Sequence, residues 1–250
     1  MKRTLFLATM MAAGSWAATT YTFTGSTYPL GVPGPGVGGI ANFTSCVVGP
    51  CASFTTAMRV SGSFTVAAAL PANFGPSNII AQVTSYSFSN GITTFTNTNP
   101  NSRIGSFVVA TDGTGNISVA SGDIYLQLWL TGSSPHSPGD RAADMDVGPG
   151  LSGSFTPTTN NQACSTVGTA GSGVTDTCTF FSARDSSTSF ASNNGGSWTI
   201  GPGGGPGGPG APAPTGVPAL GEWGVILLGF LLAVVAWLRL RRQGGPTLAA

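Results

Sequence analysis

Hydrophobic and polar side chains alternate along much of the chain between residues 18 and 200, as they do in β-strands that bury one face. The segment Thr20-Tyr21-Thr22-Phe23-Thr24 alternates hydroxyl and aromatic groups, and Ser63-Phe64-Thr65-Val66 repeats the pattern. Further strands are predicted at residues 54–58, 62–68, 79–88, 92–97, 104–111, 116–120, 123–130, 151–157, 178–183 and 197–200. No segment here carries a sustained helical period with caps, so the region is predicted to be all-β.

Turn residues join several of these predicted strands. Ser89-Asn90-Gly91 lies between two alternating runs, and Asn and Gly tolerate the positive φ angles of a type I′ hairpin turn. Asp112-Gly113-Thr114-Gly115 separates the next two runs. Residues 123–130 are apolar on both faces, which indicates a central strand covered on both sides. We therefore expect one antiparallel β-sandwich domain over residues 18–200, although a closed barrel fits the same spacing.

Residues 131–150 are expected to form a long loop, and they contain the one acidic stretch that suggests a metal site. Asp144 and Asp146 are two apart, so their carboxylates point the same way in an extended chain. Together with Asp140 and loop carbonyls they could hold Ca²⁺, which binds six to eight oxygens. The spacing matches neither an EF-hand nor a glycine-aspartate repeat. The alternative is a polar loop in which Arg141 pairs with one aspartate.

The two ends of the sequence indicate export. Residues 1–17 have basic residues at positions 2 and 3, a short apolar segment, and Ser15-Trp16-Ala17 before a predicted cleavage, as in a secretory signal peptide. Residues 201–216 are almost entirely Gly, Pro and Ala, which predicts a linker. Residues 221–238 would rise about 27 Å as a helix, close to the ~30 Å hydrocarbon core of a bilayer.

Arginines occur only on the C-terminal side of this predicted transmembrane helix, at Arg239, Arg241 and Arg242. The positive-inside rule then places residues 244–250 in the cytoplasm and the domain outside the inner membrane. Pro218 cannot continue a helix upstream, so extended chain is expected to meet the helix there.

The segment 217–243 resembles a known C-terminal signal. Its quoted residues are Val217, Pro218, Ala219, Leu220, Trp223, Gly224, Arg239, Arg241 and Arg242. They resemble the IPTL-CTERM signal, a relative of PEP-CTERM found in Gram-negative bacteria. The resemblance implies cleavage near the motif by an exosortase-type membrane enzyme and transfer to the cell surface. Val217 and Ala219 differ from the Ile and Thr that are commonest at these motif positions. The alternative is a plain membrane anchor with a periplasmic ectodomain.

Composition excludes some partners and favours an oxidising compartment. Only 7% of the residues are charged, against about 25% in typical proteins, so the domain cannot neutralise a row of phosphates and nucleic-acid binding is not expected. The four cysteines are Cys46, Cys51, Cys164 and Cys178. Pairing of near neighbours gives the simplest of the three possible disulfide connectivities. A zinc site is the alternative, but the lone His136 lies far from both pairs in sequence.

No residue pattern in the domain indicates catalysis or a cofactor. A usual glycosidase needs two opposed carboxylates, whereas aspartates such as Asp112 and Asp123 occur singly in predicted turns. His136 lies between prolines and is interpreted as a loop residue, and Gly171-Ser172-Gly173 falls short of a Gly-x-Ser-x-Gly nucleophile elbow. The glycine-rich stretches contain proline and do not lead into helices, unlike phosphate-binding loops. The chain is therefore predicted not to be an enzyme.

The aromatic residues leave a second function open. Tyr125, Trp129 and Trp198 could stack against sugars on a sheet face, although such residues more often fill a sandwich core. The sequence thus predicts a non-enzymatic protein of the cell surface or extracellular matrix. A surface glycan-binding or adhesive module, with extracellular polysaccharide as partner, is the alternative.

Overall fold

The computed structural model describes residues 18–33, 37–118, 123–148 and 155–202. These residues form β-strands and a single 3₁₀ turn, η1 (Ile80–Gln82). The strands are β1 (Thr19–Gly25), β2 (Gly39–Ala41), β3 (Ser61–Val66), β4 (Ser77–Asn78), β5 (Val83–Ser89), β6 (Thr94–Thr96), β7 (Ser102–Val109), β8 (Asp123–Trp129), β9 (Arg141–Val147), β10 (Phe155–Gly168), β11 (Thr177–Phe181), β12 (Ser189–Asn194) and β13 (Gly196–Pro202).

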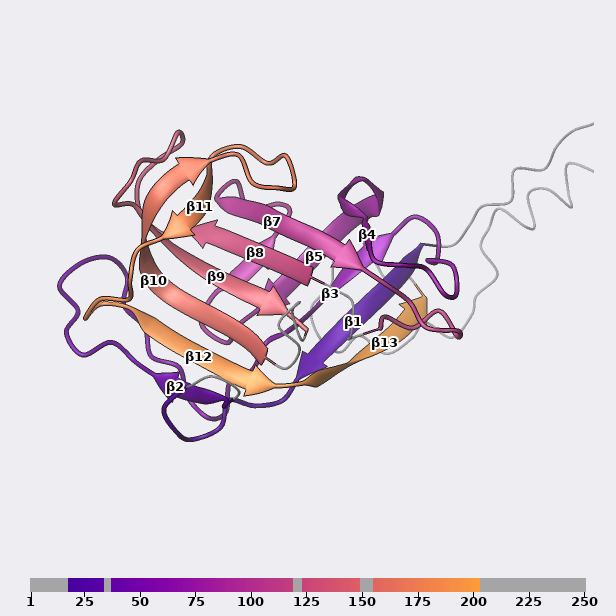
Figure 1. Ribbon diagram of the computed structural model, residues 1–250, viewed down its shortest axis with the longest axis horizontal. Helices are drawn as coiled ribbons and strands as arrows, with labels where there is room; N and C mark the ends of the chain where they lie inside the picture. The colour runs from indigo at the N-terminus through magenta and orange to yellow at the C-terminus, as the bar shows by residue number, and fades with distance from the viewer. Residues whose placement is uncertain (1–17, 34–36, 119–122, 149–154, 203–250) are drawn as a thin grey trace, which may run out of the picture. The chain divides into compact units, whose positions relative to one another are not determined.

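The strands form two separate antiparallel sheets (Figure 1). One sheet has five strands in the order β13-β1-β3-β5-β6, and the other has the order β2-β12-β10-β9-β8-β7-β4, with β11 paired to β10 as an eighth strand. Both sheets contribute side chains to one buried core, for example Phe64 on β3 and Phe107 on β7, whose ring centroids are 5.1 Å apart. The domain is therefore a β-sandwich.

The core follows from the alternation seen in the sequence. On β1 the buried residues Tyr21 and Phe23 alternate with hydroxyl residues that face outward. The ring of Tyr21 stacks on that of Phe64 with centroids 5.0 Å apart, and the ring of Phe23 packs against that of Trp198 of β13 with centroids 5.1 Å apart. Gly62 lies opposite both Phe23 and Phe88, and a Cβ at this glycine would meet the backbone oxygen of Ser87 at 2.2 Å. The glycine thus gives room for the closely packed aromatic rings.

Several predicted strands are confirmed. Residues 20–24 lie in β1, residues 104–111 overlap β7, and residues 123–130 overlap β8. As predicted, β8 is an interior strand, because it pairs with β7 on one side and β9 on the other. Its residues Leu126 and Gln127 face opposite sides of the sheet, and both are almost completely buried.

The expected long loop at residues 131–150 is wrong in its second half, where β9 pairs with β8 and β10. The core side of β9 is Ala143, Met145 and Val147, all buried. Aspartates occupy the alternate positions, so in the sequence this strand resembles an acidic loop. Residues 54–58 are also not a strand, and near 116–120 the described residues make only a bridge between Thr111 and Ile117.

The turn at Asn90 differs in type from the prediction. Gly91 has a φ of 96°, whereas Asn90 does not have a positive φ, so the turn is not type I′. The Asn90 side-chain oxygen instead accepts hydrogen bonds from the backbone N–H groups of Ile92 (2.9 Å) and Thr93 (2.7 Å). The hairpin itself is confirmed, because β5 pairs with β6.

Candidate functional site

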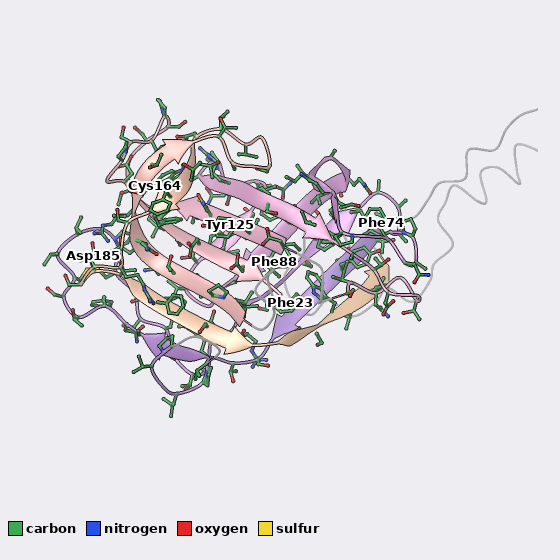
Figure 2. All side chains as sticks on the ribbon, in the orientation of Figure 1. Phe23, Phe74, Phe88, Tyr125, Cys164 and Asp185 are labelled. Atoms are coloured by element: carbon green, nitrogen blue, oxygen red, sulfur yellow. A yellow bond between two sulfur atoms is a disulfide. The ribbon has the colours of Figure 1, made fainter. Side chains whose placement is uncertain are left out.

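The side of the eight-stranded sheet that faces away from the five-stranded sheet carries Asp144 and Asp146, together with two of the aromatic residues singled out above. We call it the outer face. On β8 it carries Tyr125, Gln127 and Trp129, and on β9 it carries Ala142, Asp144 and Asp146. These positions alternate with the buried core residues of the same strands. Figure 2 shows Tyr125 on this sheet.

Asp144 is held by neighbouring protein groups. Its Oδ1 accepts hydrogen bonds from the Thr159 backbone N–H (2.9 Å) and hydroxyl (2.6 Å), and its Oδ2 accepts one from the Tyr125 hydroxyl (3.2 Å). Asp140 is engaged elsewhere, because its Oδ2 accepts from the Ser137 backbone N–H at 2.8 Å. Within the described ranges no three His, Cys, Asp or Glu residues are grouped so that they could hold a metal ion. The structure therefore does not assemble Asp140, Asp144 and Asp146 into the calcium site considered above.

Burial disfavours the ionised forms of the acidic residues in this part of the outer face. Burial raises the pKa of Asp146 to about 8, and the neighbouring carboxylates of Asp144 and Asp123 add to the effect. Burial likewise raises the pKa of Asp144, although hydrogen bonds from Thr159 oppose the shift. The pKa of Tyr125 is raised well above its usual value, first by burial and then by Asp144. At neutral pH this group of residues therefore retains a proton on Asp146.

His136 is part of a buried cluster around Asp176, which we call the Asp176 cluster (Arg103, Trp129, His136 and Asp176). The His136 ring stacks on Trp129 with centroids 4.3 Å apart, and its Nδ1 lies 2.9 Å from Asp176 Oδ2. Arg103 donates to the same carboxylate oxygen at 2.6 Å. The His136 side chain has no solvent-exposed surface, so it is not placed to act as a general base on a dissolved substrate.

Asp176 fastens the segment before β11 to the outer face. Its backbone oxygen accepts hydrogen bonds from Trp129 Nε1 (2.8 Å) and Arg103 Nε (3.0 Å). Burial disfavours its charge, but hydrogen bonds from the His136 backbone and from the Arg103 and His136 side chains hold its pKa well below the ordinary range. Sequence reasoning missed this cluster because its members lie on four separate segments: β7, β8, the segment after β8 and the segment before β11.

The β10–β11 hairpin covers the adjoining part of the outer face. The Gln127 side-chain amide exchanges two hydrogen bonds with the backbone of Cys178, donating to its oxygen at 2.8 Å and accepting from its N–H at 3.0 Å. Trp129 packs with the Cys164–Cys178 disulfide in a second small apolar cluster. These contacts explain why β8 is buried on both faces.

Both predicted disulfides are present. Cys46 is bonded to Cys51 and Cys164 to Cys178, which is the near-neighbour connectivity. Figure 2 labels Cys164 of the second disulfide. The zinc alternative is therefore wrong. The Cys46–Cys51 loop is attached to the eight-stranded sheet through Asn161, whose side-chain amide donates to the Val48 oxygen at 2.8 Å.

The three aromatic residues considered as a sugar platform lie in different places. Trp198 comes from the five-stranded sheet and packs against the core with Phe23 and Phe64. Tyr125 and Trp129 lie on the outer face of the other sheet, where Trp129 is only 2% exposed. The core interpretation is confirmed for Trp198, and the described residues provide no joint stacking surface made by all three.

Arg141 also differs from its expected role. Rather than pairing with a nearby aspartate of the acidic stretch, its guanidinium bonds to Asp185 and to the backbone oxygen of Asn161. The hydrogen bonds from Arg141 lower the pKa of Asp185 to about 2. This ion pair joins β9 to the turn before β12, so its role in the fold is structural. Figure 2 shows Asp185 at that end of the sheet.

The described domain is thus a disulfide-linked antiparallel β-sandwich. Comparison with family models adds the C-terminal segment: residues 215–242 match the IPTL-CTERM motif, and the chain carries this sorting motif. No curated protein and no solved structure matches the chain significantly. In the described part of the chain no helix is both long and apolar enough to cross a membrane. The predicted signal peptide, the predicted helix at 221–238 and every quoted motif residue lie outside the described residues.

Proposed function

We propose that this chain is a non-enzymatic exported protein of the cell surface or extracellular matrix, and that its C-terminal tail is the substrate of an exosortase-type membrane enzyme. The observation that carries the proposal is the IPTL-CTERM motif at residues 215–242, which lies C-terminal to the β-sandwich domain in the sequence. Two disulfides support an oxidising destination, because such bonds persist mainly outside the cytosol.

Each part of the tail has a role in this proposal. Residues 217–220 present the extended segment near which the enzyme cuts, since Pro218 prevents a helix from continuing through it. Trp223 lies at the membrane interface, where its ring has both apolar and polar surroundings. Residues 221–238 span the inner membrane, at least transiently. The arginines Arg239, Arg241 and Arg242 keep the C-terminal end on the cytoplasmic side.

The topology of the sandwich supports processing at both chain ends. β1 and β13 pair along their whole length, with Thr19 opposite Pro202 and Gly25 opposite Gly196. The expected mature N-terminus near residue 18 and the start of the linker are therefore adjacent at the same end of one sheet. Removal of either terminal segment would leave this strand pair complete.

Two epitope tags in a host that contains the sorting enzyme test the proposal. The outer tag belongs between Gly207 and Gly208, because β13 extends to Pro202 and an insertion before Gly201 would interrupt it. The second tag follows Ala250. We expect the outer tag at the surface or in the medium, on a product that has lost the tail tag. Both tags on one full-length protein in the inner membrane would instead identify a plain anchor.

A matched pair of proline variants separates loss of the motif proline from loss of a nearby linker proline. Pro218→Ala changes the motif, whereas Pro214→Ala changes a linker proline just outside the matched residues. Pro218→Ala should leave more of the chain uncut in the inner membrane, and Pro214→Ala should be processed like the natural sequence. Equal processing of the two variants would contradict a role for Pro218 in the cut segment.

A further inference from the structure

β13 is the longest edge strand of the described domain. The other strands that have a partner on one side only are β11, with five residues, and β2, β4 and β6, with two or three residues each. Short edge strands are one of the ways in which proteins prevent unwanted pairing. β13 has seven residues, and within the described part of the chain it pairs with β1 alone.

β13 also lacks the other protective features of edge strands. Its sequence, Gly-Ser-Trp-Thr-Ile-Gly-Pro, contains no charged residue, and its only proline is the last residue. Ser197, Thr199 and Ile200 are exposed, and Ile200 is 42% exposed although it is a large apolar residue. A strand of this kind presents unpaired backbone N–H and C=O groups that fit another extended strand.

We infer that β13 pairs with β13 of a second copy of this chain, in antiparallel orientation, so that the two five-stranded sheets become one continuous sheet. The observation behind this inference is that β13 is a seven-residue edge strand without charged residues, so two copies of it can pair. Like charges cannot oppose each other when two identical uncharged strands pair. A two-fold axis perpendicular to the sheet keeps the core side of one copy next to the core side of the other.

The strand length fixes the register. Only one antiparallel alignment of two copies pairs all seven residues from Gly196 to Pro202, and its midpoint is Thr199 opposite Thr199 of the second copy. Trp198, which packs against the core, then lies opposite Ile200 of the second copy, so that both exposed apolar surfaces are partly covered.

The hydroxyl residues of the sheet support the same register. Ser197 and Thr199 face away from the core, where they continue a row of outward hydroxyls through their β1 partners Thr24 and Thr22. Cross-strand Thr pairs of this kind stabilise sheets by hydrogen bonding between side chains. Edge pairing buries less surface than the roughly 1,200 Å² of a stable complex, so the dimer should be weak and favoured by confinement to one membrane.

Cysteine cross-linking of the full chain, in the membrane of a host that lacks the sorting enzyme, tests the register. In Thr199→Cys the two cysteines would be directly opposite, with Cβ atoms about 5 Å apart, close enough for a disulfide after a small adjustment. In Ser197→Cys, on the same strand and face, they would be about 14 Å apart, because each lies opposite Gly201 of the second copy. We expect a disulfide-linked dimer from Thr199→Cys and at least tenfold less from Ser197→Cys.

A mixed pair checks the alignment further. Gly201→Cys is compatible with the structure, because no atom lies within 4 Å of an added Cβ. Chains carrying Ser197→Cys and chains carrying Gly201→Cys, produced together with different tags, should form mixed dimers. Absence of a Thr199→Cys dimer, or equal dimer from Thr199→Cys and Ser197→Cys, would overturn the inference.

A lysine pair gives a test without added cysteines. Thr199→Lys places like charges opposite each other at the centre of the shared strand, whereas Thr24→Lys changes an exposed residue of the same face one strand away from the edge. Sedimentation of the full chain in mild detergent should show a dimer dissociation constant raised up to about fivefold by Thr199→Lys and unchanged by Thr24→Lys. Equal dissociation constants for the two variants would count against the shared edge. All these measurements concern the uncut chain, so they do not depend on tail processing.

Discussion

The carboxyl group of Asp146, whose pKa is raised by burial, should make the domain less stable as the pH rises. Its pKa is raised from the ordinary 3.8 to about 8, mainly by burial. At a pH between these values the folded chain keeps the proton, whereas the unfolded chain has lost it. The free energy of unfolding then falls as pH increases, because the folded state binds more protons. Asp146→Asn should remove this dependence, since asparagine is neutral at every pH.

The magnitude follows from the proton count. One additional proton in the folded state corresponds to a slope of about 1.4 kcal/mol per pH unit between roughly pH 4 and pH 8. The natural chain and Asp146→Asn should therefore have similar free energies of unfolding near pH 4. From pH 5 to pH 7 the variant should gain up to about 3 kcal/mol relative to the natural chain.

Urea unfolding of the purified, disulfide-intact chain at pH 5, 6 and 7 measures this difference. Asp112→Asn is the control, because Asp112 is an exposed turn residue whose pKa is lowered, mainly by hydrogen bonds from Thr114. At pH 5 and above Asp112 is ionised in both the folded and the unfolded chain, so its contribution to the free energy of unfolding no longer changes with pH. This variant should therefore change stability equally at all three pH values. If the difference between Asp146→Asn and the natural chain is the same at pH 5 and pH 7, the argument from burial is refuted.

Three further changes test the packing. Gly62→Ala should destabilise the domain by at least about 1–3 kcal/mol, measured as a lower urea midpoint, because its Cβ would meet the Ser87 oxygen at 2.2 Å. Asp176→Ala should cost about 3–5 kcal/mol at neutral pH, because it leaves Arg103 buried without its partner. That loss should shrink as the pH falls below about 4. The natural Asp176 carboxylate becomes protonated as the pH approaches its lowered pKa, so the natural chain then loses the same stabilising charge. Replacing the Cys164–Cys178 disulfide by two alanines should cost about 3 kcal/mol, seen as a lower thermal midpoint, given its sequence separation of 14 residues.

The sequence predicted the all-β class because many strands show clean alternation, as β1 does with Tyr21 and Phe23. It failed where the inward residues were small or polar. In β10 and β12 the buried positions include Thr158, Asn160 and Asn193, so the strands resemble surface turns in the sequence. Such residues are buried here because neighbouring polar groups satisfy them, as the Asn90 side chain does for the Thr158 hydroxyl at 2.8 Å.

The candidate site was predictable only in part for a related reason. The tail motif is local in sequence, so its residues could be recognised without the fold. The Asp176 cluster instead depends on β7, β8 and two connecting segments that come together only when the sheet forms. Nothing near His136 in sequence indicates that its ring stacks on Trp129.

The intact mass of the mature protein at the cell surface tests the central claim most directly. If the tail is a sorting substrate, the polypeptide should begin near residue 18 and end between Val217 and Glu222, and every mass that includes Arg239 should be absent from the surface fraction. A surface protein that retains residues through Ala250 would contradict the proposed cleavage.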